Sequence, residues 1–200
     1  MRHHLIGVAL AAAALATIVF AGCSSGPATP PNTPTSNPAT AQSSGVAVEH
    51  NQADVTFAQQ MIPHHAQAVA MTDLAATRAV TPQVRDLAGR IARGQGPEIE
   101  QMNTMLDTWG APRPQTGSMS SMAMTGMMSD QQMDELAAAG GPAFDQTFLT
   151  MMTAHHQGAV TMAQAELGSG QNPQAKQLAQ AIITAQQAEL VEMATLLRQG

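Results

Sequence analysis

The sequence predicts an all-α fold, a four-helix bundle made of two tandem αα-hairpin repeats with a methionine-rich loop between them. First, the stretch 54–71 recurs 91 residues later as 145–162, with Phe, Met and a His-His pair at the same positions. Second, the same offset continues beyond the histidines and pairs Pro82 with Pro173 and Glu98 with Glu189. Third, each copy reads as two helices, so each hairpin can bury its apolar face against the other.

Each of the four helices has its own start and stop signals. The first is expected from Asn51, a good N-cap residue, to about residue 79. Pro63 lies in its interior and predicts a bend beside the histidines. Thr81-Pro82 and Asn172-Pro173 open the second and fourth helices in the same way. The expected ranges of the other three helices are roughly 82–108, 142–167 and 173–200.

The connection between the hairpins, residues 111–141, is long for a helical bundle, and long connections are often functional. Residues 129–139 begin with an N-cap residue, follow a helical pattern and predict a short helix. The rest is either an exposed flexible segment or an accessory site that captures copper. Its candidate ligands are Met119, Met122, Met124, Met127 and Met128.

The N-terminal quarter does not have the composition of a folded domain. Residues 1–22 have a short basic start, one apolar run and a small-residue end, which is typical of a secretory signal peptide. Phe-Ala-Gly-Cys resembles the lipobox of bacterial lipoproteins, with Phe20 where Leu is usual, so Cys23 is the expected lipidation site. Residues 23–50 are rich in Pro, Ser and Thr and predict a flexible tether to the membrane. Residues 51–200 form the expected domain, with repeats 51–110 and 142–200.

Composition excludes some partners and favours others. The chain has no Tyr, one Trp and a formal net charge of −6, so neither base stacking nor phosphate contact is favoured and no nucleic-acid partner is expected. Metal cations are not repelled by this charge. Methionine is over-represented, with 15 residues, which is the compositional feature that needs an explanation.

One face of the first and third helices carries side chains that bind metals. At about 100° per residue, the repeated positions fall within a sector of roughly 120°. Met61 and His65 are four residues apart and can hold one ion from successive turns, while His64 and Met71 are seven apart along one line. The second copy repeats both arrangements. The candidate ligands are His64, His65, His155, His156, Met61, Met152, Met71 and Met162.

Buried imidazoles and carboxylates need partners, so this face must pair internally, bind an ion or line water. Thioether together with imidazole selects soft or borderline metals, copper(I) above all, whereas iron needs more oxygen ligands. The plainer interpretation is that the methionines pack as core and the histidines are hydrogen-bonded core residues. Four carboxylates could orient the histidines, although the two aspartates could equally cap their helices: Asp54, Asp145, Glu98 and Glu189.

The stretches FAQQMIPHHAQAVAM and FLTMMTAHHQGAVTM, with Trp-Gly after the second helix, closely resemble the bacterial family of unknown function DUF305. The resemblance covers Asn51 to the C-terminus, and the doubled M-x-x-H-H is its specific part. It implies a ferritin-like four-helix bundle in an exported protein. It also implies copper handling by Met61, His64, His65, Met152, His155 and His156.

Three functions remain open at this point. The first is a lipoprotein of the cell envelope, on the periplasmic or extracellular face, that binds copper for sequestration, resistance or delivery without being an enzyme. The second is a ferritin-like di-metal oxidoreductase with iron or manganese, although Gln101 and Glu192 replace the histidines of the Glu-x-x-His motif. The third is a structural or partner-binding bundle without metal. A metal-exchange partner, a homo-oligomer, and either one or two metal sites are compatible with the sequence.

Overall fold

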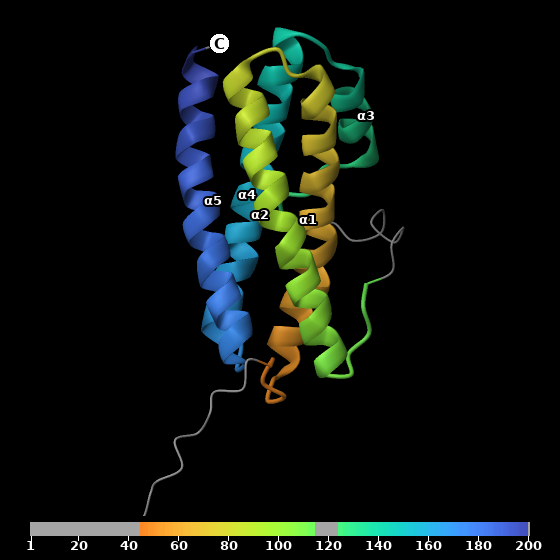
Figure 1. Ribbon diagram of the computed structural model, residues 1–200, viewed down its shortest axis with the longest axis vertical. Coiled ribbons are helices and arrows are strands. Elements are labelled where there is room, and N and C mark those ends of the chain that lie inside the picture. Colours follow the sequence, from red (N-terminus) through yellow and green to blue (C-terminus); the bar gives the residue numbers. More distant parts are fainter. Residues whose placement is uncertain (1–44, 115–123, 200) are drawn as a thin grey trace, which may run out of the picture. The chain divides into compact units, whose positions relative to one another are not determined.

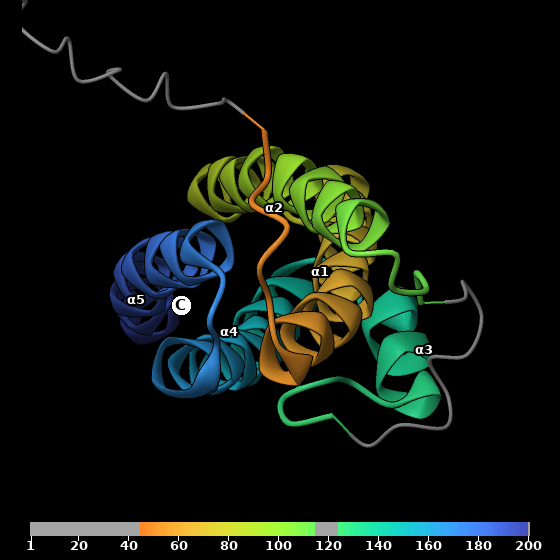
Figure 2. The same cartoon turned by 90° about the horizontal axis from the view of Figure 1, so that it is seen from below.

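The computed structural model describes residues 45–114 and 124–199, and within these ranges it contains five helices and no strand. Four long helices run side by side in Figure 1: α1 (Gln52–Arg78), α2 (Pro82–Thr108), α4 (Pro142–Ser169) and α5 (Pro173–Gln199). The short α3 (Asp130–Ala138) lies outside this group, against α1 and α4 (Figures 1 and 2). The predicted all-α bundle is therefore confirmed. No helix in the described ranges has the length and apolar character needed to cross a membrane.

Most helix ends follow the predicted signals. Asn51 and Asp54 form a capping box, in which the Asn51 side chain accepts from the backbone N–H of Asp54 and the Asp54 carboxylate accepts from that of Asn51. α1 continues through Pro63 as one helix, and α4 ends at Ser169, two residues later than expected. The two Pro-initiated helices differ, because the Asn172 side chain caps α5 whereas Thr81 makes no capping hydrogen bond with its side chain.

Equivalent hydrogen bonds in the two hairpins indicate an approximate twofold axis between them. Within each hairpin, α1 contacts α2 and α4 contacts α5; between the hairpins, α1 contacts α4 and α2 contacts α5. The same interactions recur at the 91-residue offset on both sides of this axis, as the site below shows. The duplicated sequence therefore folds as a duplicated structure.

The apolar core is divided into two clusters at opposite ends of the bundle. One cluster contains Phe57, Met61 and Met102, and it draws on the first half of α1 and of α5. The other contains Met71 and Phe148, together with residues of α3 and of the segments just before and after α3. The residues between the clusters along the four long helices are polar, and we call them the central layer: His64, His65, Gln95, Glu98, His155, His156, Gln186 and Glu189.

Residues 45–50 pack onto the bundle, although the sequence places them in the tether. The Ala47 carbonyl accepts hydrogen bonds from Trp109 Nε1 at 3.1 Å and from Asn172 Nδ2 at 2.9 Å. The His50 ring stacks on Trp109 with the ring centroids 5.0 Å apart. The packed region therefore begins before Asn51. Cys23 and the expected signal peptide lie outside the described residues.

Candidate metal centre

The central layer brings the two predicted histidine pairs together. His64 and His65 come from α1, His155 and His156 come from α4, and all four side chains are completely buried. The ring centroids of His64 and His155 lie 3.7 Å apart, with the ring planes inclined by 38°. These two imidazoles therefore meet where α1 crosses α4.

The other two histidines are each held by a glutamate of the neighbouring helix. His65 Nε2 lies 2.8 Å from the Glu98 carboxylate, and His156 Nε2 lies 2.7 Å from the Glu189 carboxylate. A carboxylate only accepts hydrogen bonds, so in both pairs Nε2 carries the proton. In the neutral ring the lone pair is then on Nδ1, which is the atom left to bind a metal. Glu98 and Glu189 thus have the geometry predicted for groups that orient histidines.

Burial keeps the two facing imidazoles neutral. Loss of solvation, followed by the nearby His65 ring, lowers the pKa of His64 to about 3, while the Thr125 carbonyl opposes this shift only partly. The pKa of His155 is also far below its usual value, chiefly because of burial and next because of His64. A metal binds the neutral form of imidazole, so both rings are in the state that ligation requires.

Many polar atoms of the central layer have no hydrogen-bond partner among the described residues. They comprise five ring nitrogens of the four histidines and all the amide nitrogen and oxygen atoms of Gln95 and Gln186. The two amides are 3% and 2% exposed and occupy equivalent positions of the repeat. Each buried polar group left dry costs about 1–3 kcal/mol. The layer is therefore built to be filled by an ion, by water or by both.

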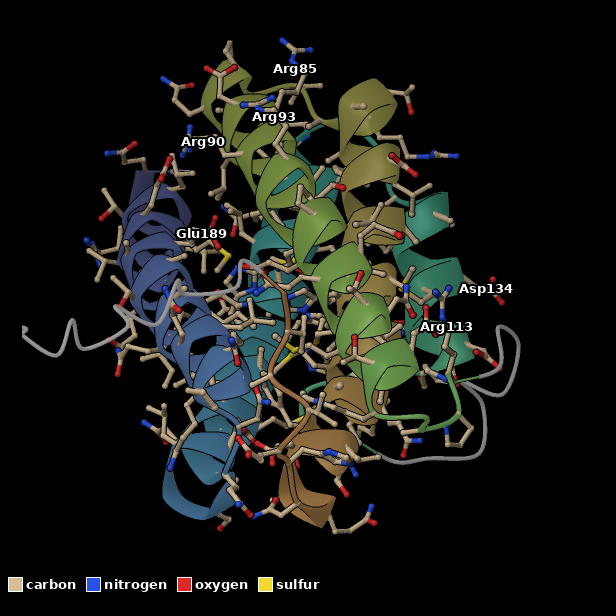
Figure 3. All side chains as sticks on the ribbon, turned by 60° about the horizontal axis from the view of Figure 1, so that its bottom comes forward. Arg85, Arg90, Arg93, Arg113, Asp134 and Glu189 are labelled. Carbon is tan, nitrogen blue, oxygen red and sulfur yellow. The ribbon has the colours of Figure 1, made fainter. Side chains whose placement is uncertain are left out.

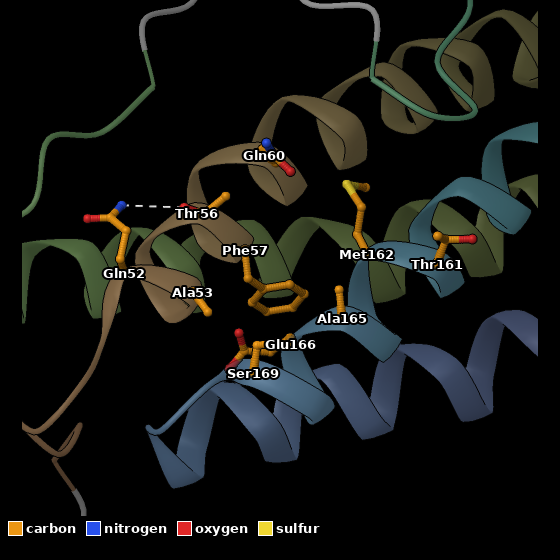
Figure 4. Close-up of a pocket in the computed structure, with 10 residues that line it drawn as sticks. All are labelled: Gln52, Ala53, Thr56, Phe57, Gln60, Thr161, Met162, Ala165, Glu166 and Ser169. Atoms are coloured by element: carbon orange, nitrogen blue, oxygen red, sulfur yellow. Dashed lines mark hydrogen bonds between the residues drawn. The ribbon is translucent and has the colours of Figure 1, made fainter.

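The thioethers are distributed unequally around the histidines. Met61, Met71 and Met152 are completely buried; Met61 belongs to one apolar cluster, and Met71 and Met152 belong to the other. Met162 is only partly buried and lines a surface pocket of about 430 Å³ beside Phe57 and Glu166 (Figure 4). Within the described ranges, no three His, Cys, Asp or Glu side chains are arranged to hold a metal ion. An ion in the central layer would therefore need ligands of other kinds besides imidazole nitrogen, and the buried thioethers are candidates.

The two aspartates at the helix starts hold loops of the opposite hairpin. The Asp54 carboxylate accepts from the backbone N–H of Gln171 at 3.0 Å and of Asn172 at 2.9 Å, in the α4–α5 loop. The Asp145 carboxylate accepts from the equivalent N–H groups of Val80 and Thr81 at 3.2 and 2.9 Å. The sequence leaves two roles open, orienting a histidine and capping the aspartate's own helix. Asp54 does take part in the capping box of α1, whereas Asp145 binds the α1–α2 loop.

A third buried carboxyl group lies beside Asp54. Burial, followed by contact with the Asp54 carboxylate, raises the pKa of Glu166 to about 8. Burial disfavours the charge of Asp54 as well, but its hydrogen bonds with Asn51, Glu166 and Asn172 outweigh that effect and lower its pKa. The two carboxyl groups therefore share one negative charge near neutral pH.

Residues 124–128 cross the outer face of α1 and α4, and we call them the strap. The Thr125 carbonyl lies 3.3 Å from His64 Nε2, and Gln67 exchanges two hydrogen bonds with the backbone of Met128, at 2.8 and 2.7 Å. Gly158 gives the strap room, because a Cβ there would meet the Thr125 carbonyl. Of the predicted loop ligands, Met124, Met127 and Met128 belong to the strap, while Met119 and Met122 lie outside the described residues.

The sequence interpretation missed three parts of this site. Gln95 and Gln186 carried a usable signal, because both keep a polar residue at the repeat offset on the helix face that also carries Glu98 and Glu189. Gln67 and Gly158 also occupy equivalent positions, and their difference marks where the repeat is broken. Nothing in the local sequence indicates that Thr125 faces His64.

Solved structures similar to this chain include DUF305 proteins. A DUF305 protein of Streptomyces coelicolor, provisionally described as secreted, is 35% identical, with a TM-score of 0.68 over 74% of this chain and 91% of that one. A DUF305 fragment from Deinococcus radiodurans is 32% identical, with a TM-score of 0.69 over 75% and 98%. CopM in its Cu(II)-bound form is 33% identical, with a TM-score of 0.66 over 73% and 96%. CopM is also known in a Cu(I)-bound form, for which the TM-score is 0.63.

A comparison with curated proteins gives no match. The family model for the domain of unknown function DUF305 matches residues 54–197, which include most of both hairpins, the strap and the whole central layer. This chain is therefore a member of the DUF305 family.

Proposed function

We propose that this protein binds copper, most favourably as Cu(I), in the central layer of the bundle. The observation that carries the proposal is the pair of neutral, fully buried imidazoles of His64 and His155. Their ring centroids lie 3.7 Å apart, and both rings retain nitrogens that have no partner among residues 45–114 and 124–199. Buried thioethers adjoin this layer in both apolar clusters. Imidazole with thioether is a donor set for soft metals.

The carboxylates argue for copper over iron or manganese. Hard cations prefer several oxygen ligands. Glu98 and Glu189 are already paired with His65 and His156, and Asp54 and Asp145 accept from backbone N–H groups. Copper-bound relatives in the family support the same choice, because CopM has Cu(I)-bound and Cu(II)-bound forms.

We infer further that the protein is an exported binder that sequesters or delivers copper, rather than an enzyme. The signal-like residues 1–22 and the lipobox-like Cys23 support export and attachment to a membrane by lipid. The provisional description of the Streptomyces coelicolor relative as secreted agrees with export. Mass spectrometry of the mature N-terminus, with Cys23→Ser as the control, tests lipidation.

Anaerobic titration with Cu(I) against a chromophoric chelator tests metal binding. We expect wild type to bind Cu(I) and His64→Ala/His155→Ala to lose most of its affinity. His50→Ala is the matched control, because His50 stacks on Trp109 at the bundle surface and not in the central layer. Equal stoichiometry and affinity in wild type and the double variant would refute the proposal.

Thermal unfolding gives a second readout of the same site. A ligand that binds only the folded state stabilises it by about 2.7 kcal/mol at a free concentration 100 times its Kd. Cu(I) should therefore raise the Tm of wild type and of His50→Ala, and leave that of the double variant nearly unchanged. Iron or manganese that raised the Tm more than Cu(I) would overturn the choice of metal.

A further inference from the structure

The imidazoles can be approached from two faces of the bundle, and the strap covers one of them. On the α1/α4 face, the Thr125 carbonyl lies against the His64 ring. Gly126 has a φ of 85° and fits closely over the backbone of α4, where an added Cβ would lie 2.9 Å from Gly158 Cα. Gln67 fixes the end of the strap through its two hydrogen bonds with Met128. An ion could pass this face only after the strap had moved.

The opposite face, between α2 and α5, offers carboxylates that reach both solvent and the imidazoles. We call this face the seam. The side chains of Glu98 and Glu189 are 21% and 19% exposed, whereas the His65 and His156 side chains bonded to them are fully buried. Figure 3 shows Glu189 on the side of α5 that faces α2. One turn further along α5, Glu192 bonds Arg90 of α2 at 2.6 Å, so this part of α5 adjoins α2.

Two buried amides lie one helical turn before these carboxylates. Gln95 precedes Glu98 by three residues and Gln186 precedes Glu189 by three, so each amide is on nearly the same helix face as its glutamate. Within the described part of the chain, neither amide has a partner for its oxygen or its nitrogen. An amide oxygen can ligate a cation weakly, and the amide N–H groups can hold its water. Weak successive sites are what a passage needs, because an ion must be able to leave each one.

From these contacts we propose that the seam is the passage through which copper reaches and leaves the buried imidazoles, with Glu98 and Glu189 as its outer sites and Gln95 and Gln186 as its inner sites. This rests on the proposed function of copper binding. Two partly exposed carboxylates beside the buried imidazoles attract cations and raise their association rate. Arg90 is bonded to Glu192, which offsets its positive charge at the edge of the seam.

The first test measures Cu(I) uptake by anaerobic stopped flow in the whole mature protein. Glu98→Gln/Glu189→Gln keeps an oxygen acceptor for each histidine but removes both charges. We expect its association rate to fall about three- to tenfold at low salt and the salt dependence of the rate to weaken. Glu49→Gln/Glu100→Gln removes the same charge from exposed positions outside the seam and should leave the rate unchanged.

The second test replaces the inner sites. Gln95→Leu/Gln186→Leu should slow both uptake and release, with Kd changed by less than about threefold because the imidazole ligands remain. Its Tm should be no lower than that of wild type, since two unpartnered amides are removed from the interior. A purely structural role for these glutamines predicts unchanged rates, and that result would overturn the inner sites.

The third test opens the other face. Gln67→Ala removes both hydrogen bonds that hold Met128 and should leave the uptake rate unchanged if copper uses the seam. Faster uptake by Gln67→Ala, together with wild-type rates in the Glu98→Gln/Glu189→Gln variant, would overturn the proposal that copper enters through the seam. It would indicate entry past the strap instead. The failure of the proposed function can be distinguished from the failure of the proposed passage. If wild type binds no Cu(I) at equilibrium, copper binding itself is refuted. If all variants bind Cu(I) but their rates equal those of wild type, only the passage is refuted.

Discussion

Gly158→Ala tests whether the strap is held by close backbone contact with α4. A Cβ at this position would lie 2.7 Å from the Thr125 carbonyl carbon and 2.9 Å from Gly126 Cα, and both neighbours are backbone atoms. Real Cβ contacts essentially never come this close, so the strap must move away. The contact between Thr125 and His64, now 3.3 Å, would then be lost.

The expected magnitude combines two opposing effects. Overpacking of this kind costs about 1–3 kcal/mol, whereas replacing a mid-helix Gly by Ala gains about 0.5–1 kcal/mol. The net loss should lie between about 0 and 2.5 kcal/mol, and a chain of this length then loses up to roughly 10 °C in Tm. Gly94→Ala is the matched control, because Gly94 is an exposed mid-helix glycine whose Cβ would meet nothing within 4 Å.

Urea denaturation of both variants at neutral pH, together with the Tm, provides the measurement. Gly94→Ala should be slightly more stable than wild type and Gly158→Ala less stable. Limited proteolysis should also cut Gly158→Ala faster within the strap. If Gly158→Ala proved as stable as Gly94→Ala, the strap would not be bound as the contacts indicate.

Three further predictions concern buried ionisable groups. Asp54→Asn should lower the free energy of unfolding in urea by about 1.5–3 kcal/mol, because the Asp54 carboxylate accepts hydrogen bonds from backbone N–H groups of two segments. Asp73 is exposed, so Asp73→Asn should leave the free energy of unfolding almost unchanged. The folded-state pKa of His64, about 3, lies below its unfolded value of 6.5, so the free energy of unfolding of wild type should fall by up to about 1.4 kcal/mol per pH unit as the pH drops from 6.5 to 3. His64→Gln should flatten that slope, and an equal slope in both proteins would contradict the prediction. The folded-state pKa of Glu166, about 8, lies above its unfolded value of 4.5, so the stability that protonated Glu166 contributes is lost as the pH rises from 4.5 to 8. The urea midpoint of Glu166→Gln should therefore rise relative to that of wild type across this range. A constant difference between the two midpoints would count against a protonated Glu166.

The helices could be predicted from the sequence because the residues that start a helix act locally. Asn51, Pro82 and Pro173 mark helix starts through the chemistry of a few neighbouring residues, and the duplication doubles each observation. The end of α4 was less accurate, since Gly168 and Ser169 remain helical instead of ending the helix. The course of the strap could not be predicted, because the connection that carries it has no counterpart in the repeat to restrict its position.

The histidines of the centre were predictable, but the surroundings of the methionines were not. Met71 and Met162 occupy equivalent positions in the repeat, so pattern alone treats them alike. In the structure Met71 is buried in one apolar cluster with Leu136 of α3, whereas Met162 lines a surface pocket (Figure 4). Two equivalent positions of the repeat thus have different surroundings, and only long-range packing reveals the difference.

Asp54 and Asp145 show that the two halves of this chain complete one another. The first helix of each half ties down the turn of the other half, and neither turn obtains these bonds from its own hairpin. A single hairpin made as a separate polypeptide would leave its turn without them. Two identical copies could supply them to each other, so a symmetric pair of half-length chains is the natural forerunner of this duplicated protein.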